Sequence, residues 1–200
     1  MKAFNFAFKQ AGPDLHTTLF NNLKRLNNHD FDLKNENRAK LVFHSINERI
    51  MVRSAIKPSG ITSIEETLDV EQGNRIKGTV TLSQIKQCYL SKDEIANFIK
   101  EKGREPNNKE IYPYLLMTGE RLDQYIVTLF AKSGMNLEKF IHIENGSRYF
   151  KKTDTSFKAI DVVFEAKITD IQLFEKAWYN GIGRYKTMGF GMLRVINNEG

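Results

Sequence analysis

The sequence predicts an α+β protein built from two tandem ferredoxin-like domains, each with the element order βαββαβ. Two observations support this fold class: the same succession of strand-like and helix-like patterns occurs twice, offset by about half of the chain, and 200 residues suffice for one domain or two small ones. A linker-like Glu-Pro-Asn-Asn segment at residues 105–108 lies between the two patterns. We therefore expect an N-terminal domain over residues 1–88, a helical insertion and linker over 89–110, and a C-terminal domain over 111–200.

The first half begins with a strand, because phenylalanine occupies every second position of residues 4–8. Gly-Pro-Asp at residues 12–14 then indicates the start of a helix, which leucines at helical spacing continue. Residues 39–45 and 50–56 predict two strands of a hairpin joined at Asn47-Glu48. The other elements expected in this half are one or two helical turns over residues 63–68 and a strand over 75–82.

The second half begins after a helix predicted over residues 91–103, where Ser91 is a favourable N-cap and Gly103 a favourable end. Asn145-Gly146 is the strongest hairpin signal of the chain and predicts a turn between two short strands. The remaining pattern predicts strands over 111–117, 140–143, 148–151, 159–168 and 188–195, and helices over 118–130 and 171–179.

The composition limits the classes of protein that the chain can represent. Hydrophobic residues make up 40% and charged residues 27%, which is typical of a globular protein, and no apolar stretch approaches the ~18–20 residues of a bilayer span. The single cysteine, Cys88, excludes an internal disulfide and favours a reducing, cytoplasmic setting. A formal net charge of +6 favours an anionic partner without choosing between nucleic acid and acidic protein.

The segment from residue 180 to 192 is the most informative part of the sequence, because it holds four of the 13 glycines, with Arg184 and Lys186 between them. Backbone N–H groups of glycine can approach an anion closely, and the two cations add charge. The spacing matches neither a dinucleotide-binding fingerprint nor a Walker loop. A contact to an RNA phosphate backbone is the functional interpretation; a glycine-rich turn needed for tight packing is the structural alternative.

Basic and aromatic residues also alternate around the second predicted hairpin. Such a pattern is typical of RNA contacts, in which cations bind phosphates and aromatic rings stack on unpaired bases. A solvated strand edge whose lysines prevent edge pairing explains the pattern as well. The basic residues are Arg148, Lys151, Lys152 and Lys158, and the aromatic residues are Tyr149, Phe150 and Phe157.

The carboxy-terminal GxGRxKxxGxG motif, followed by Met-Leu-Arg-Val, resembles the glycine-rich loop of the CRISPR-associated RNA-binding (RAMP) superfamily, and closely that of CasE-like pre-crRNA endoribonucleases of type I-E systems. Residues 12–19 resemble the family's amino-terminal helix with its catalytic histidine, and residues 51–54 the strand that follows. Residues 115–118 and 122–130 resemble the start of its second domain. The resemblance thus runs over nearly the whole chain in the expected order.

The resemblance implies paired ferredoxin-like domains, a topology shared with RNA-recognition (RRM) folds, and cleavage of CRISPR repeat RNA on the 3′ side of a hairpin stem. It also implies metal-independent chemistry without a cofactor, in which the ribose 2′-hydroxyl attacks the adjacent phosphate and leaves a 2′,3′-cyclic phosphate. The implied partners are the 3′ hairpin of crRNA and the other subunits of a crRNA-guided surveillance complex in the cytoplasm. The sequence itself contains no Cys/His cluster with metal-ligand spacing.

The resemblance assigns the catalytic histidine to His16, which lies in the first turn of the first predicted helix, at the edge of its leucine stripe. The positive end of the helix dipole favours the neutral imidazole that a general base requires. The structural alternative is a surface histidine beside a helix cap. Several family members have a tyrosine where this chain has Pro13, so Tyr185 or Lys186, or else Tyr149 and Lys151, would have to substitute for it.

The sequence therefore predicts a catalytic set and an RNA-binding set. The catalytic residues are His16, Tyr185 and Lys186, and the RNA-binding residues are Gly181, Gly183, Arg184, Lys186, Gly189, Gly191, Arg148, Lys151, Lys152 and Lys158. Two other functions fit the same features: a catalytically inactive subunit that binds the crRNA hairpin, and an unrelated tandem RNA-recognition module.

Overall fold

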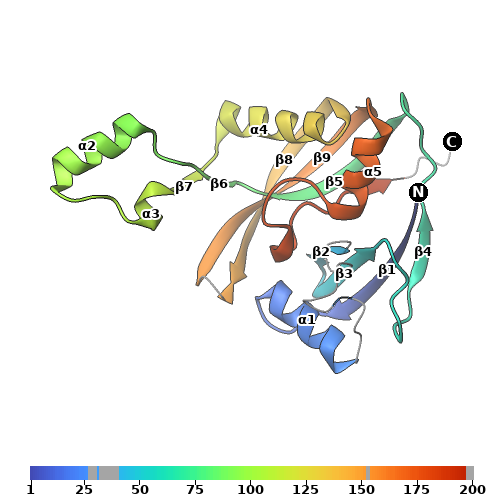
Figure 1. The fold of residues 1–200 in the computed structure, drawn as a ribbon. Coiled ribbons are helices and arrows are strands. Elements are labelled where there is room, and N and C mark those ends of the chain that lie inside the picture. The colour runs from blue at the N-terminus through green and yellow to red at the C-terminus, as the bar shows by residue number, and fades with distance from the viewer. Residues whose placement is uncertain (27–30, 32–40, 152–153, 197–200) are drawn as a thin grey trace.

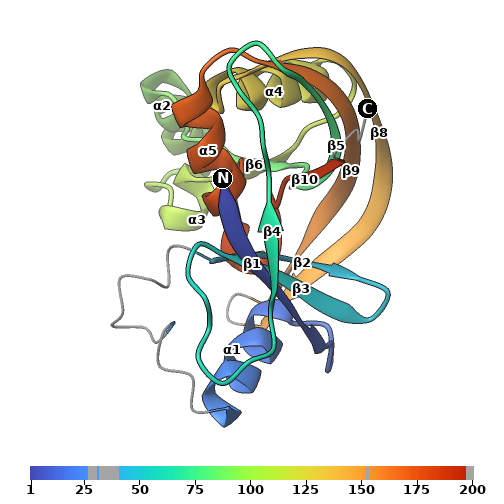
Figure 2. The same cartoon turned by 90° about the vertical axis from the view of Figure 1, so that its right-hand side faces the viewer.

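The computed structural model describes residues 1–26, 31, 41–151 and 154–196. Its first sheet contains four antiparallel strands in the order β2-β3-β1-β4, with one helix against it (Figure 2). The elements of this half are β1 (Lys2–Lys9), α1 (Leu15–Arg25), β2 (Leu41–Ile46), β3 (Arg49–Ser54) and β4 (Ile64–Thr67).

The structure confirms the first predicted strand, the first helix and the hairpin that follows, although residues 39 and 40 of its first predicted strand lie outside the described residues. Asn47 and Glu48 join β2 to β3 with backbone φ angles of 47° and 58°, as a two-residue hairpin turn requires. Residues 63–68 were predicted wrongly as helical turns, because Ile64–Thr67 is a strand that pairs with β1. Residues 55–63 form no helix either, so this half has the strand order of a ferredoxin-like domain without its second helix.

The second sheet also contains four antiparallel strands, in the order β10-β5-β9-β8. Its elements are β5 (Arg75–Ser83), α4 (Gly119–Lys132), β8 (Met135–Phe150), β9 (Thr155–Ile168), α5 (Ile171–Asn180) and β10 (Arg194–Ile196). This is a complete βαββαβ succession, and α4 and α5 cover one face of the sheet (Figure 1). The predicted α+β class with two ferredoxin-like halves is therefore confirmed.

Sheet membership does not coincide with the predicted residue boundaries. β5 lies within residues 1–88, yet it pairs with β9 and β10 of the second sheet. The physical reason is that β4 already occupies the edge of the first sheet beside β1. The chain therefore crosses from one sheet to the other over residues 68–74.

Three further predictions differ from the structure. Asn145-Gly146 lies inside the long strand β8, at a shift in the pairing register between Glu144 and Ser147, and it forms no hairpin turn. Of residues 188–195, predicted as a strand, only the last two lie in β10, and a 3₁₀ turn, η3 (Lys186–Met188), precedes them. Residues 111–117 contain the end of a short helix, α3 (Asn108–Ile111), and the strand β7 (Tyr114–Leu116).

An arm projects from the body between two short strands, β6 (Ile85–Gln87) and β7, which pair with each other (Figure 1). It contains α2 (Lys92–Lys102), the helix predicted over residues 91–103, and α3. Ser91 and Glu94 form a reciprocal capping box, and Gly103 ends the helix in the left-handed conformation. No residue of α2 is buried, so this helix contributes nothing to the packing of either four-stranded sheet.

One buried cation joins the two halves. Arg53 of β3 is 3% exposed, and its guanidinium lies 2.9 Å from Glu66 of β4 and 4.5 Å above the ring of Trp178 of α5. It also donates to the carbonyl oxygen of Leu193, at 2.6 Å. A buried guanidinium is stable only when its donors are satisfied, and here groups from both halves satisfy them.

No helix in the described ranges is long and apolar enough to span a membrane.

Candidate nucleic-acid interface

His16 lies half-buried in the first turn of α1, where the two halves meet. Its imidazole ring is 4.7 Å from the ring of Phe20, one turn further along α1. The ring of Phe150, at the end of β8, meets the imidazole edge-on at 5.8 Å. The histidine predicted from the motif is therefore held between an aromatic ring of its own helix and one from the second sheet.

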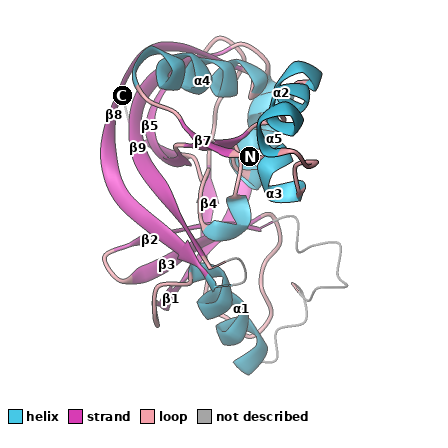
Figure 3. Ribbon diagram, turned by 90° about the vertical axis from the view of Figure 1, so that its left-hand side faces the viewer, coloured by secondary structure: helices cyan, strands magenta, loops and turns pink. Residues whose placement is uncertain are grey.

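The carboxylate of Asp14 links α1 to the second half of the chain, because it accepts hydrogen bonds from both. It is the N-cap of α1, where its Oδ1 accepts a hydrogen bond from the backbone N–H of Thr17 at 2.9 Å. Its Oδ2 accepts a second from the backbone N–H of Lys151, also at 2.9 Å, at the end of the β8–β9 ribbon that reaches α1 (Figure 3). Burial opposes the ionisation of Asp14, but these two hydrogen bonds outweigh it and hold its pKa below the usual range.

The change Asp14→Asn tests this double acceptor. An amide oxygen still accepts from Thr17, but the amide NH₂ then faces the N–H of Lys151, and two donors cannot bond. We expect the free energy of unfolding to fall by about 1.5–3 kcal/mol, the range for a hydrogen bond to a charged group. Urea unfolding followed by circular dichroism measures this, and Asp14→Ala, which also loses the helix cap, should cost more. Equal stability of Asp14→Asn and the wild type would contradict the proposed role of the carboxylate.

The glycine-rich segment forms a loop that closes on itself. The backbone N–H of Ile182 donates to the carbonyl oxygen of Gly191 at 2.8 Å, and the N–H of Gly191 donates to Thr81 of β5 at 2.7 Å. Gly191 has a φ of +85°, and a Cβ there would overlap the carbonyl oxygen of Ile182. Gly181 is also crowded, though less so, since its Cβ would lie 2.8 Å from the oxygen of Gly191. Tight packing therefore explains these two glycines.

The same loop packs against the helix that carries the histidine. A Cβ on Gly189 would lie 3.0 Å from Leu15 and 3.3 Å from Phe43, so the loop meets α1 at the residue before His16. The N–H of Gly189 donates a hydrogen bond to the carbonyl oxygen of Lys186, and the N–H of Gly191 donates one to the carbonyl oxygen of Thr81 in β5. Neither N–H group is therefore available to a phosphate in this conformation. The cationic side chains of the loop are those of Arg184 and Lys186.

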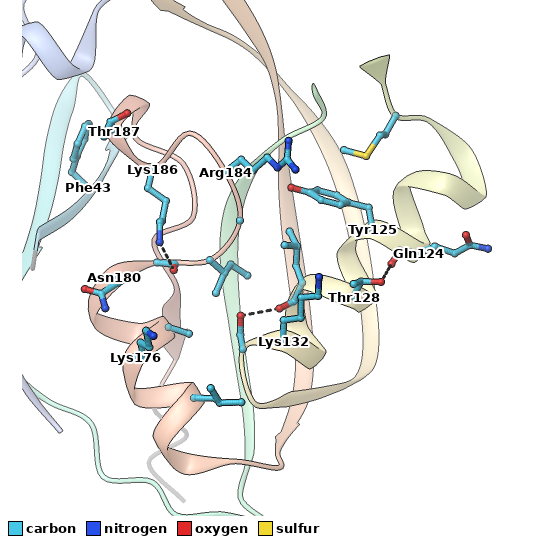
Figure 4. A pocket seen from close by; sticks show the side chains of 18 of the residues that line it. Phe43, Gln124, Tyr125, Thr128, Lys132, Lys176, Asn180, Arg184, Lys186 and Thr187 are labelled. Carbon is cyan, nitrogen blue, oxygen red and sulfur yellow. Dashed lines mark hydrogen bonds between the residues drawn. The ribbon is translucent and has the colours of Figure 1, made fainter. Parts of the chain in front are cut away.

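Lys186 and Arg184 line a cavity of about 1520 Å³ (Figure 4), whereas Tyr185 does not belong to its lining. The Lys186 ammonium lies 3.5 Å from the carbonyl oxygen of Gly181, and burial, together with the nearby Lys176, lowers its pKa. The ring of Tyr185 lies 4.5 Å from that of Phe157, and burial raises the pKa of its hydroxyl, which has no hydrogen-bond partner among the described residues. Of the two residues predicted to assist His16, Lys186 is the one that faces open space.

The basic hairpin divides into exposed and interior residues. Lys151 and Lys158 are exposed, and Lys152 lies outside the described residues. Arg148 instead turns inward, with its guanidinium carbon 5.3 Å above the ring of Phe190, and burial lowers its pKa. Tyr149 donates a hydrogen bond to Asp154 at 2.9 Å, which shapes the end of the hairpin.

His44 of β2 lies in the interface of the two sheets and is 4% exposed. Burial lowers its pKa to about 3, and the positive charges of Arg194 and Arg148 add to the effect, against the weaker opposing charge of Asp161. Its Nδ1 has no hydrogen-bond partner within the described ranges. The residue is therefore a neutral interior histidine, as expected for a histidine on a buried strand.

Acid should consequently destabilise the protein through His44. The pKa of His44 is lower in the folded state than in the unfolded state. Its contribution to the free energy of unfolding is therefore fully present above pH 6.5 and is lost as the pH falls toward 3. At pH 5 we expect a loss of about 2 kcal/mol relative to pH 8 from this residue alone. Urea unfolding at both pH values measures it. The difference should shrink by that amount in His44→Gln and persist in His142→Gln; an unchanged difference in His44→Gln would contradict the assignment.

Sequence reasoning missed three contributors to this site. Asp14 was recognised only as part of a helix start, and Phe20 and Phe150 were not expected to flank His16. A capping signal was present for Asp14, but its second contact is with a residue 137 positions away, which no local pattern encodes. Within the described residues, no three His, Cys, Asp or Glu side chains gather as a metal site requires.

The comparison with solved structures supports the resemblance at the level of the fold. Cas6e from Escherichia coli K-12 is 16% identical and superposes with a TM-score of 0.64, covering 98% of both chains. Thermus thermophilus Cse3, bound to an RNA representing a pre-cleavage complex, is 9% identical, with a TM-score of 0.63 over 98% of this chain and 100% of that one. A chain of a CRISPR RNA-guided surveillance complex in a pre-nicking state is 18% identical, with a TM-score of 0.61 over 98% and 99%.

No family model matches the chain, and no curated protein matches it either. The similarity therefore lies in the arrangement of strands and helices over almost the full length of the chain. The sequence identities are too low to assign the roles of individual residues from these structures. The chain has the two-domain fold of the CasE-type CRISPR endoribonucleases.

Proposed function

We propose that this protein is an endoribonuclease that binds the hairpin of CRISPR repeat RNA and cleaves the precursor on the 3′ side of the stem. The observation that carries the proposal is the convergence of three separate elements at the N-terminus of α1. His16 lies there, Asp14 binds the basic β8–β9 hairpin there, and the loop with Arg184 and Lys186 packs against Leu15. The imidazole of His16 thus lies on the turn of α1 that both cation-bearing segments of the other half contact.

The arrangement suits transesterification within the RNA chain. His16 accepts the proton of the ribose 2′-hydroxyl, the 2′-oxygen forms a bond to the adjacent phosphorus, and the bond from phosphorus to the 5′-oxygen breaks. The leaving oxygen takes up a proton and becomes a 5′-hydroxyl, while the other product ends in a 2′,3′-cyclic phosphate. The phosphorane-like transition state gains negative charge, and the ammonium of Lys186 is the loop group that we assign to stabilise it.

The exposed cations of the hairpin supply the RNA-binding surface in this proposal. Lys151 and Lys158 are available to phosphates, and Phe150 beside His16 offers a ring on which an unpaired base can stack. After cleavage the product hairpin stays bound, and the protein carries it as a subunit of a crRNA-guided surveillance complex. Solved structures with this fold include one bound to RNA before cleavage and one within such a complex.

A non-catalytic crRNA-binding subunit is the second candidate, and Pro13 is the residue that favours it. If the tyrosine that several CasE-like proteins have at this position is essential, then the fold and the basic surface remain while cleavage is lost. The ring of Tyr185 packs against Phe157, which argues against Tyr185 as its replacement. Lys186 would then be the only predicted substitute among the loop residues that faces the cavity.

The deciding experiment incubates the wild-type protein with a panel of CRISPR repeat RNAs that fold into hairpins, in the presence of EDTA. We expect cleavage of a cognate repeat to give a product with a 2′,3′-cyclic phosphate, detected by mass spectrometry. The same RNA with a 2′-deoxy nucleotide at the scissile position should bind with unchanged affinity and stay intact. Cleavage of the 2′-deoxy RNA would overturn the mechanism, and tight binding without cleavage of any repeat would establish the second candidate instead.

A further inference from the structure

A long cavity leads away from the site between the two helices that cover the second sheet. α4 forms one side and α5 the other, and the glycine-rich loop and β2 close the end near α1 (Figure 4). Its volume of about 1520 Å³ exceeds the roughly 300–1,000 Å³ of typical small-molecule sites. A polymer segment therefore fits its size better than a single metabolite. We call it the α4–α5 groove.

The charge of the groove has one sign. Among the described residues its lining contains no aspartate or glutamate, and its basic residues are Arg121 and Lys132 of α4, Lys176 of α5, and Arg184 and Lys186 of the loop. Arg121, Lys132 and Lys176 form no ion pair with any described carboxylate. Lys176 is also close enough to Lys186 to lower its pKa, so positive charges repel each other here. Such a groove attracts a polyanion.

Much of the groove lining is apolar, and an apolar surface favours single-stranded over double-stranded RNA as the ligand. A duplex presents phosphates and sugars to a protein and hides its base faces in the stack, whereas unpaired nucleotides expose faces that bury on apolar and aromatic side chains. Tyr125 of α4 reaches into the groove opposite Arg184 and offers a ring for such contacts (Figure 4). The apolar lining consists of Phe20, Leu41, Phe43, Leu115, Met117, Leu129, Leu173, Ala177 and Ile182.

The groove is continuous with the proposed reaction site. Phe20 lines the groove, and its ring is also the nearest aromatic neighbour of His16, at 4.7 Å. Lys186, which we assign to the scissile phosphate, lines the groove too. An RNA strand that passes His16 has a direct path into the groove, along which cations and apolar surface continue.

We propose that the α4–α5 groove binds the unpaired nucleotides that flank the repeat hairpin, with phosphates on Arg121 and Lys132 and bases over the apolar lining. That the bound nucleotides lie beside a repeat hairpin rests on the proposed function. That the groove binds single-stranded RNA does not. An amphipathic helix of a partner protein, with acidic residues toward the rim, is the competing occupant. The cationic side chains of the lining, which includes no acidic residue in the described part of the chain, and the continuity with His16 favour RNA.

Fluorescence anisotropy tests the proposal with four labelled RNAs: a repeat hairpin alone, the same hairpin with an unpaired extension of about ten nucleotides on its 5′ side, the hairpin with that extension on its 3′ side, and an oligouridylate of about ten nucleotides. The test variant is Arg121→Gln/Lys132→Gln, and the matched control is Lys139→Gln/Lys167→Gln, which removes two exposed charges from β8 and β9. Wild type should bind one extended hairpin more tightly than the bare hairpin.

The test variant should bind the extended hairpin and the oligouridylate about tenfold more weakly than wild type, with affinity for the bare hairpin unchanged. Two lost single-strand contacts should also reduce the slope of log K against log salt by about 1.4. The control variant should match wild type on every RNA.

The possible failures separate the two proposals. Equal weakening on the bare hairpin would overturn the groove proposal, because the stem would then occupy the groove. Unchanged binding of every RNA would overturn it as well and leave the groove to a protein segment, while the hairpin-binding function would stand. Loss of oligouridylate binding in the test variant, with no hairpin bound by wild type, would support the groove as a single-strand site and overturn the proposed function.

Discussion

The change His16→Ala is expected to lower the rate of repeat-RNA cleavage by about 10²–10⁴-fold while leaving the affinity for the RNA nearly unchanged. The imidazole lies between Phe20 and Phe150 at the surface where the two halves meet, and its removal deletes the proton acceptor without removing a cation. Single-turnover cleavage with protein in excess measures the chemical step apart from product release. The RNA dissociation constant, from anisotropy on the 2′-deoxy substrate, measures binding.

A matched control and a rescue separate catalysis from structure. His142→Ala removes a histidine of β8 that pairs with Asp123, away from the site, and should cleave like wild type. Added imidazole should restore part of the activity of His16→Ala, because a free base can occupy the vacated position. Cleavage by His16→Ala at the wild-type rate would refute the assignment, and so would an equal loss of binding and cleavage without rescue.

The change Gly191→Ala should be the most damaging single-methyl change in the loop. An alanine at a φ of +85° costs about 1–2 kcal/mol in backbone strain. Its Cβ would also overlap the carbonyl oxygen of Ile182 and break the two hydrogen bonds of Gly191 with Ile182 and Thr81, each worth about 0.5–1.5 kcal/mol. We expect a total loss of about 2–5 kcal/mol in the free energy of unfolding, together with loss of cleavage as Lys186 moves.

Urea unfolding and the cleavage assay measure the two effects of Gly191→Ala. The control is Gly103→Ala, which carries the same kind of strain at a φ of +66° but places its Cβ in open space at the end of α2. Gly103→Ala should lose only the stability that the backbone strain costs, and it should cleave RNA normally. If the two variants lost the same stability, the overlap with Ile182 would contribute nothing and the loop would be more adaptable than its contacts indicate.

Local sequence patterns predicted the elements whose stability is local. The β2–β3 hairpin depends on two turn residues, and α2 on a capping box, so neighbouring residues suffice to specify them. Asn145-Gly146 failed as a turn because β9 offers a partner along the whole of β8, and the ladder absorbs the pair as a bulge. Residues 63–68 failed for a similar reason, since the free edge of β1 draws Ile64–Thr67 into the sheet.

The parts of the candidate site that belong to a sequence motif could be predicted. The parts that depend on tertiary packing could not. The position of His16 and the glycine-rich loop followed from their sequence context, whereas the contact of Asp14 with Lys151 depends on how the two halves meet. The α4–α5 groove had no signature either, because Arg121 and Lys132 resemble the solvated face of any amphipathic helix. The interior position of Arg148 was hidden in the same way, since its burial follows from the loop that places Phe190 beneath it.

The arm has a consequence for how a chain of this fold can change in length. The β6–β7 ladder and the hydrogen bond from Cys88 N–H to Pro113 carbonyl, at 3.0 Å, hold the two ends of residues 88–113 side by side. A short turn between β6 and β7 would therefore close the chain without disturbing either sheet. The arm is a modular insertion, and its tip beyond Gly103 is a natural attachment point for a label or an added segment.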